Sequence, residues 1–173
     1  WSDDHIADFF EYNHPDFMET NAKMRLVQNE IAHLRKGAML LILSRIEYAA
    51  AVSYLIRTHC DIPVYTMHHL TSQEEFHEAK TLLQTGNRIG VVIGLCTSST
   101  LTGHNFPNIE TLMFLTFHFN QSLIRQGIGR LNRPGRTLPF PPRIVIAIYE
   151  NSMEDAMMNL SARKQKSIDS FCE

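Results

Sequence analysis

The sequence predicts an α/β domain of three layers, in which a mainly parallel sheet is covered by helices on both faces. Short runs that are apolar on both faces alternate along the chain with segments of helical periodicity. Repeated strand-helix units of this length favour parallel neighbours, because each helix carries the chain back to the starting edge of the sheet. The chain has 173 residues, of which 44% are hydrophobic, enough for one domain with a sizeable core.

The first part of the chain predicts a helix that leads into a buried strand. Residues 1–20 are poorly periodic and are expected to form a peripheral arm, so the domain proper is expected over residues 21–173. Apolar side chains recur at helical spacing over residues 22–34, and residues 38–43 (AMLLIL) form a strand that is apolar on both faces. The elements expected next are a helix over 47–59, a strand over 63–67 and a helix over 71–85.

The rest of the chain continues the same alternation. Thr71 and Glu74 have the spacing of a capping box at the start of a helix. Residues 136–142 contain three prolines, which exclude a central strand and predict a linker. Residues 152–166 predict a closing helix with acids first and bases last, as the helix dipole favours. Further strands are expected over 89–95, 111–117 and 143–149, and a further helix over 120–133.

Composition limits the classes of function. The net charge is -2, so any contact with nucleic acid must come from a local basic edge and not from an overall attractive field. Three widely spaced cysteines do not suggest a disulfide framework and fit a reducing compartment. No apolar run has the length of a membrane span and no signal peptide is evident, so an intracellular protein without membrane contact is expected. Because the sequence begins on Trp1 without an initiator methionine, we expect a fragment or a processed piece of a longer chain.

Residues 126–136 (QGIGRLNRPGR) hold the most informative pattern. Gln126, Arg130 and Arg133 are spaced by four and three residues, which places them on one helix face. Two guanidiniums on a rigid edge suit a phosphate chain, because their planar donors can neutralise charge that develops during phosphoryl transfer. Two glycines in the same stretch weaken a helix and allow another backbone or a ligand to approach closely. The alternative is a solvated basic helix end whose arginines offset the helix dipole.

Polar residues follow two of the predicted strands, Ser44 and Arg45 after the first and Thr97 to Asn105 after the third. Parallel sheets collect ligands at the carboxyl ends of their strands. Hydroxyls and free backbone amides at such ends can bond a sugar-phosphate chain without reading bases. The alternative is that these residues only end strands, cap a helix and form turns, with Gly103 and Asn105 supplying unusual backbone angles.

Two other patterns are weaker. Gly127-Ile128-Gly129 resembles part of a dinucleotide fingerprint, but Asn132 takes the place of its third glycine. Nine histidines include the pair His68-His69, yet no spacing typical of zinc ligands occurs, so no metal site is expected.

The pattern Q-x-x-G-R-x-x-R-x-G over residues 126–135 resembles motif VI of superfamily-two helicases and translocases, especially the Swi/Snf-type remodelling ATPases. Other segments resemble further motifs of that family in the family's order, and together they cover most of residues 21–166. Residues 38–45 resemble motif IV, 71–75 the Thr-Ser-x-x-Glu helix start, 95–106 motif V, Phe119-Asn120 a Trp-Asn pair, and 151–166 a Glu-containing helix with downstream lysines.

The resemblance implies a RecA-like fold and a role as the second of two motor lobes in a nucleic-acid-dependent ATPase. Arg130 and Arg133 would be the phosphate-sensing and finger arginines, with Gln126 as their partner at the cleft. Gly103 would let the motif V loop approach the site closely. ATP and Mg²⁺ would be held mainly by a first lobe, which supplies a phosphate-cradling loop and an acidic magnesium-binding motif. The nucleic-acid backbone would contact Ser44, Arg45, Thr97 and Asn105.

The chain also departs from that family's pattern. No Gly-x-x-x-x-Gly-Lys-Ser/Thr sequence occurs, so the chain alone is not expected to hydrolyse ATP. Phe76 stands in place of an arginine, and Arg136 in place of a glutamine typical of remodellers. Compact lobes with these substitutions resemble viral members of the global-transactivator group.

The resemblance implies partners as well. They are an N-terminal helicase lobe in the parent chain and a nucleic acid, DNA in preference to RNA, with the nucleus favoured over the cytoplasm. The alternative function is an orphan lobe that binds nucleic acid or protein as a regulatory module without turnover.

Overall fold

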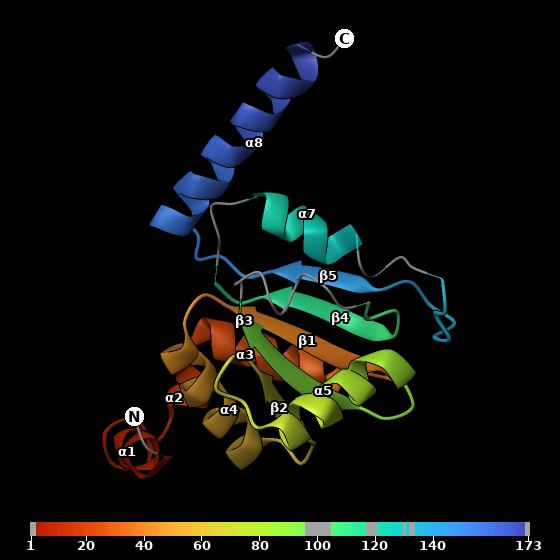
Figure 1. Cartoon of the computed structure of the whole chain (residues 1–173). Coiled ribbons are helices and arrows are strands. Elements are labelled where there is room, and N and C mark those ends of the chain that lie inside the picture. Colours follow the sequence, from red (N-terminus) through yellow and green to blue (C-terminus); the bar gives the residue numbers. More distant parts are fainter. Residues whose placement is uncertain (1–2, 96–104, 117–120, 130, 132–133, 172–173) are drawn as a thin grey trace.

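The computed structural model describes residues 3–95, 105–116, 121–129, 131 and 134–171. Within them a five-stranded sheet has the order β2-β3-β1-β4-β5, and every neighbouring pair is parallel. Helices cover both faces of this sheet (Figure 1), so the predicted α/β architecture is confirmed. The strands are β1 (Ala38–Leu43), β2 (Val64–Met67), β3 (Gly90–Leu95), β4 (Ile109–Phe114) and β5 (Arg143–Ile146).

The three central strands are buried on both faces, which explains why their sequences lack a polar face. All six residues of β1, of β3 and of β4 are buried. Successive side chains of a strand point to opposite faces, so alternate residues of β1 enter different core clusters. Met39 and Leu41 lie in one cluster, and Leu40 and Ile42 lie in the other.

The sheet lies between two pairs of described helices. α3 (Ala22–Ala32) and α4 (Ile46–His59) pack on one face, and α5 (Gln73–Thr85) and α7 (Gln121–Gly129) on the other. The connections through α4 and through α5 cross the sheet in opposite directions, so right-handed crossovers put these helices on opposite faces. α8 (Met153–Phe171) follows β5 and extends away from the body (Figure 1). None of the described helices has the length and apolar character needed to cross a membrane.

The amino-terminal arm packs on the face covered by α3 and α4. Ile6, Phe10 and Met18 are buried in the same core cluster as these two helices. The described part of the arm therefore contributes to the core of the domain. It consists of α1 (Asp3–Asp8), the π-helical turn η1 (Phe9–Asn13) and α2 (Phe17–Thr20).

The start of α5 differs from the sequence prediction by one residue. Ser72, and not Thr71, is the N-cap, and its Oγ accepts a hydrogen bond from Glu75 N at 3.2 Å. Thr71 Oγ1 instead accepts from His68 N at 3.1 Å. The predicted capping box is therefore wrong in its register, because the Thr71 hydroxyl closes the turn before the helix.

Other boundaries also differ. β4 begins at Ile109 and ends at Phe114, instead of 111 and 117, and α8 runs to Phe171 instead of 166. β5 ends at Ile146, three residues before the predicted end. The chain turns there, and Tyr149 N donates to the Glu154 carboxylate at 3.3 Å.

Candidate functional site

Ser44 and Arg45 lie at the carboxyl end of β1, beside a switch point of the sheet. The connection that leaves β1 passes over one face, whereas the connection that leaves its neighbour β4 passes over the other, and ligands collect at such points. Both residues are exposed. Arg45 occupies the N-cap of α4, where its carbonyl accepts from Ala49 N at 3.2 Å and its side chain makes no capping bond. The backbone of Arg45 thus caps α4, as one of the two interpretations of the sequence expected, and its side chain remains exposed.

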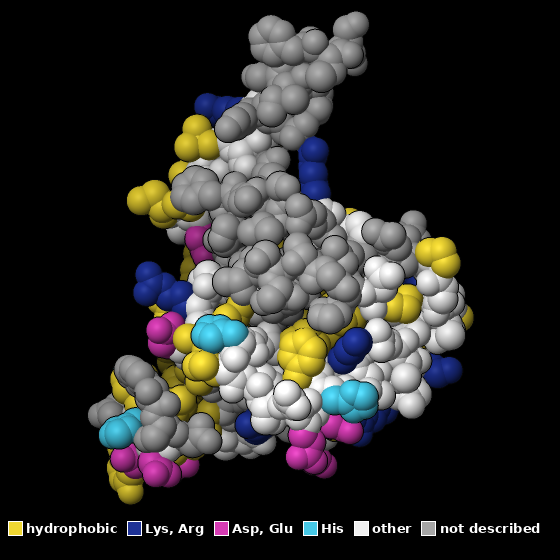
Figure 2. All heavy atoms as spheres, viewed as in Figure 1, with side chains coloured by type: hydrophobic (Ala, Val, Ile, Leu, Met, Phe, Trp, Pro, Cys, Tyr) yellow, Lys and Arg dark blue, Asp and Glu magenta, His cyan; other side chains and the backbone are white. Residues whose placement is uncertain are grey.

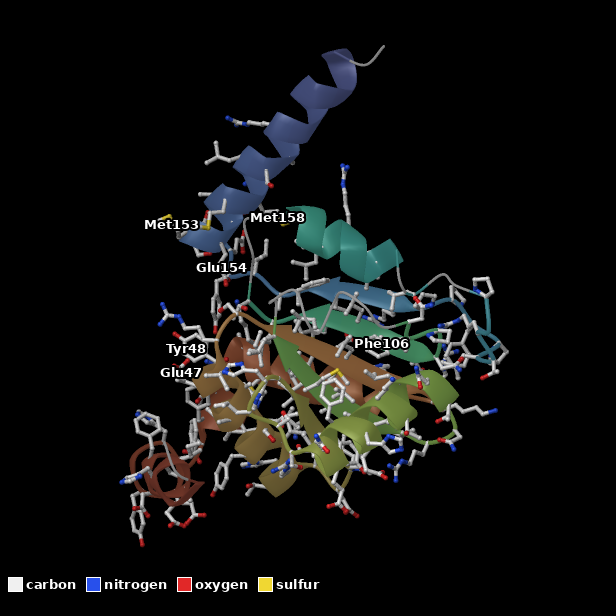
Figure 3. The ribbon with its side chains drawn as sticks, in the orientation of Figure 1. Glu47, Tyr48, Phe106, Met153, Glu154 and Met158 are labelled. Atoms are coloured by element: carbon white, nitrogen blue, oxygen red, sulfur yellow. The ribbon has the colours of Figure 1, made fainter. Side chains whose placement is uncertain are left out.

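The segment after β3 falls only partly within the described structure. Thr97 and Gly103 lie outside it. Asn105 is exposed and directly precedes Phe106, which is buried in the cluster on the face of α5 and α7 (Figure 3). Pro107 already lies beside the amino end of β4, because its carbonyl and that of the first β4 residue accept from one guanidinium. Asn105 therefore belongs to the return path toward β4 and is not part of the turn that directly follows β3.

Helix α7 contains only the first residues of the pattern over 126–136 and ends earlier than predicted. Its last residue is Gly129, and Leu131 lies in a turn in which its N–H donates to the Ile128 carbonyl at 3.1 Å. The predicted helix over 120–133 is therefore too long. Two glycines weaken its last turn, and the hydrogen bond from Leu131 to the residue three positions earlier tightens the backbone there. The helical spacing that joined the three candidate residues does not extend through the whole pattern.

The structure does not describe the side chains of the three candidate residues in this pattern. Arg130 and Arg133 are not among the described residues, and of Gln126 only the backbone is described, within α7. Because β4 and β5 are parallel, α7 returns from the carboxyl edge toward the amino edge (Figure 1). An added Cβ at Gly129 would meet no described atom within 4 Å, so packing among the described residues does not require glycine there.

Arg136, the last residue of the pattern over 126–136, lies at the amino edge of the sheet. Its Nη1 donates to the carbonyls of Pro107 and Ile109 at 2.7 and 3.0 Å, and its Nη2 donates to that of Phe140 at 2.7 Å. Burial lowers the pKa of Arg136, and the nearby Glu110 carboxylate opposes this shift. An arginine shared by three carbonyls is a structural clamp. Sequence reasoning noted Arg136 only as a departure from a motif, because the carbonyls of a fold are not visible in its side-chain pattern.

Glu110 is a second feature that sequence reasoning missed. Its carboxylate is buried within β4 and accepts from the backbone N–H groups of Arg35, Lys36 and Gly37 at 2.8 to 3.1 Å, and from Arg35 Nε at 3.2 Å. Burial alone would raise the pKa of Glu110, but these hydrogen bonds outweigh it and hold the pKa below its ordinary value. The only sequence signal was a single acid inside an apolar strand. Glu110 fastens the turn before β1 to β4.

A cavity of about 550 Å³ lies beside the carboxyl ends of β1 and β4. Leu43 and Leu115 line it from the sheet, Tyr48 from α4 (Figure 3), and Phe9 and Phe10 from the arm. Because most of its lining side chains are apolar, this cavity does not suit a phosphate chain.

On the face shown in Figure 2 the described Lys and Arg side chains are scattered among other residues. The net charge of the chain is -2, and this face carries no broad basic surface among the described residues.

Comparison with known proteins gives a match to one family model and matches to solved structures. A family model described as "Helicase conserved C-terminal domain" matches residues 22–135, well over half of the chain. Among solved structures, the crystal structure of the C-terminal part of the Fun30 ATPase domain is similar, with a TM-score of 0.67 and 15% identity. That similarity covers 82% of this chain and 46% of the other, so the chain spans about half the length of that structure. No curated protein sequence matches.

Proposed function

Since the chain belongs to the family of helicase conserved C-terminal domains, we propose that it is the second motor lobe of a nucleic-acid-dependent ATPase, a helicase or double-stranded DNA translocase of the Swi/Snf-like kind. One observation carries the proposal: within residues 22–135, motif-bearing segments follow successive strands of one parallel sheet. The similarity to the C-terminal part of another ATPase domain supports it. DNA as the nucleic acid and the nucleus as the location belong to the same proposal.

Arg130, Arg133 and Gln126 are assigned to the nucleotide. A guanidinium offers only N–H donors and has no lone pair for a metal, so the two arginines fit the phosphates of ATP and not Mg²⁺. ATP, when bound, supplies the phosphoryl group whose developing charge these arginines would neutralise. The phosphate-cradling loop and the magnesium ligands are assigned to a first lobe, since the 173 residues contain no Gly-x-x-x-x-Gly-Lys-Ser/Thr sequence.

Ser44 and Arg45 are assigned to the nucleic-acid backbone. Both are exposed at the carboxyl end of β1, and the Arg45 side chain is not used to cap α4. A hydroxyl and a guanidinium in this position can hold phosphate oxygens without reading base edges, which a translocating motor requires. Thr97 and Asn105, from the segment between β3 and β4, are assigned to the same backbone contact, and Gly103 would let that segment approach the nucleotide closely.

The test uses the protein that contains both lobes. Arg133→Ala and, separately, Arg130→Ala should lower nucleic-acid-stimulated ATP turnover by several orders of magnitude, with the circular dichroism spectrum unchanged. Arg125→Ala is the matched control, because Arg125 is an exposed arginine of α7 outside the motif pattern. Unchanged turnover in Arg133→Ala would refute the assignment. Tight nucleic-acid binding without any turnover in the unmutated protein would favour a regulatory module instead.

A further inference from the structure

The outer edge of β2 has backbone groups that no other described strand pairs with. β2 pairs only with β3 and ends the described sheet on that side. The Pro63 carbonyl accepts from Val91 N at 2.9 Å, which points it toward β3. Backbone groups alternate in direction along a strand, so those of Val64 and Thr66 point outward.

Two charged side chains form hydrogen bonds with these outward-pointing backbone groups. Arg57 Nη2, from α4, donates to the Val64 carbonyl at 3.0 Å. Glu75 Oε1, from α5, accepts from Thr66 N at 2.7 Å and from the Thr66 hydroxyl at 2.9 Å. Arg57 Nη2 and Glu75 Oε1 themselves lie 3.4 Å apart. A donor and an acceptor side by side are what the backbone of a neighbouring strand would present at this edge.

We propose that the Arg57–Glu75 pair stands in for a further strand and closes the β2 edge against pairing with β2 of a second copy of the chain. An uncovered edge is a template for strand addition, and proteins commonly block it with charges or prolines. β2 itself (VYTM) has strand-forming residues and neither a charge nor a proline, so its protection has to come from neighbouring elements. Arg57, Thr66 and Glu75 also line a cavity of about 360 Å³. Removing the pair should therefore leave the edge of β2 open to solvent.

A second ion pair beside the same strand provides a matched control. Arg88 Nη2 lies 3.0 Å from Glu78 Oε2 and donates to the Tyr65 hydroxyl at 2.9 Å. Arg88 thus contacts β2 through the Tyr65 side chain, whereas Arg57 and Glu75 bond the backbone of β2. The exposed fractions are comparable, 45% and 47% for Arg88 and Glu78 against 51% and 30% for Arg57 and Glu75. Removing either pair leaves the net charge unchanged.

The experiment compares the double variants Arg57→Ala/Glu75→Ala and Arg88→Ala/Glu78→Ala in the full chain. In dilute solution, the first should exchange the Thr66 amide hydrogen up to roughly ten-fold faster than the unmutated protein, as the loss of one hydrogen bond implies. In sedimentation velocity it should associate as its concentration rises, whereas the second variant should remain unassociated. Unchanged Thr66 exchange, or equal association in both variants, would overturn the proposal.

A second comparison covers the case in which the double variant fails to fold. Glu75→Gln keeps an oxygen that can accept from Thr66 N, and Glu75→Ala does not. Glu75→Gln should therefore remain unassociated with slow Thr66 exchange, and Glu75→Ala should associate. Identical behaviour of these two variants would show that the backbone hydrogen bond does not close the edge. Neither readout depends on ATP turnover.

Discussion

Lys23 Nζ lies 2.7 Å from both carboxylate oxygens of Glu154, a residue 131 positions later in the chain. The same ammonium donates to the Leu115 carbonyl at 2.8 Å, just after β4, and lies 4.8 Å from the centre of the Tyr149 ring. One lysine thereby joins the start of α3, the end of β4 and the first turn of α8. Figure 3 shows Glu154 at the base of α8, where that helix leaves the body.

Lys23→Met should lower the free energy of unfolding by about 1–3 kcal/mol, because it leaves a partly buried carboxylate and a carbonyl without their donor. The Lys23 side chain is only 13% exposed, so solvent cannot fully replace the lost bonds. Urea unfolding measures the change. Lys36→Met is the control, since its side chain is exposed, and it should change stability by less than about 0.5 kcal/mol. Equal stability of the two variants would show that this junction does not stabilise the fold.

Glu110 should make stability depend on acid pH. Its pKa in the fold lies below the ordinary value of 4.5, so its contribution is fully present above pH 4.5. That contribution is lost as the pH falls through the lowered pKa, when the carboxylate takes up a proton. Glu110→Gln should therefore cost about 1–3 kcal/mol at pH 7 and progressively less below pH 4.5. Unfolding curves from pH 3 to 7 measure it, and a pH-independent difference would contradict the role of the charge.

Arg45→Ala should weaken nucleic-acid binding by the protein that contains both lobes. If Arg45 neutralises one phosphate, the slope of log affinity against log salt should become shallower by about 1. Fluorescence anisotropy over a series of salt concentrations measures this slope. Arg88→Ala is the control, since Arg88 is paired with Glu78 and precedes the amino end of β3, away from the carboxyl edge. An unchanged slope in Arg45→Ala would remove Arg45 from the interface.

Gly86→Ala should be destabilising where Gly129→Ala is not. Gly86 has φ +59° at the end of α5, and an added Cβ would lie 2.6 Å from Asn108 Cβ. The left-handed backbone alone costs a side chain about 1–2 kcal/mol. At Gly129 an added Cβ meets no described atom, so stability should stay the same or rise by up to about 1 kcal/mol. Thermal unfolding of both variants measures the contrast, and a stable Gly86→Ala protein would refute it.

Much of the architecture could be predicted from sequence periodicity. The apolar run Ala38–Leu43 is strand β1 at its predicted bounds, since a strand covered on both faces has to be apolar throughout. The helicase C-terminal lobe inferred from motif order is confirmed at the level of the family, over residues 22–135. Element ends were less predictable. The end of α7 depends on the turn in which Leu131 N bonds the Ile128 carbonyl. The start of α5 depends on whether the Thr71 or the Ser72 hydroxyl accepts from an N–H of the helix.

The candidate site was predictable only as residue types in a pattern. Ser44 and Arg45 were expected after the first strand because a polar pair ends an apolar run, and the structure places them exposed at that position. The assignments of Arg130, Arg133, Thr97 and Gly103 stay predictions, since these residues lie outside the described structure.

The sequence alone determined the order of strands and helices and the family to which the chain belongs, because periodicity and motif order are local properties. Only the tertiary structure decided that Lys23 meets Glu154, that Glu110 holds the turn before β1, and that Arg57 and Glu75 cover the edge of β2. Each of these contacts joins segments whose meeting depends on how the sheet orders its strands. A charged side chain shows its type in the sequence, but the backbone group or charge it will face is set by folding.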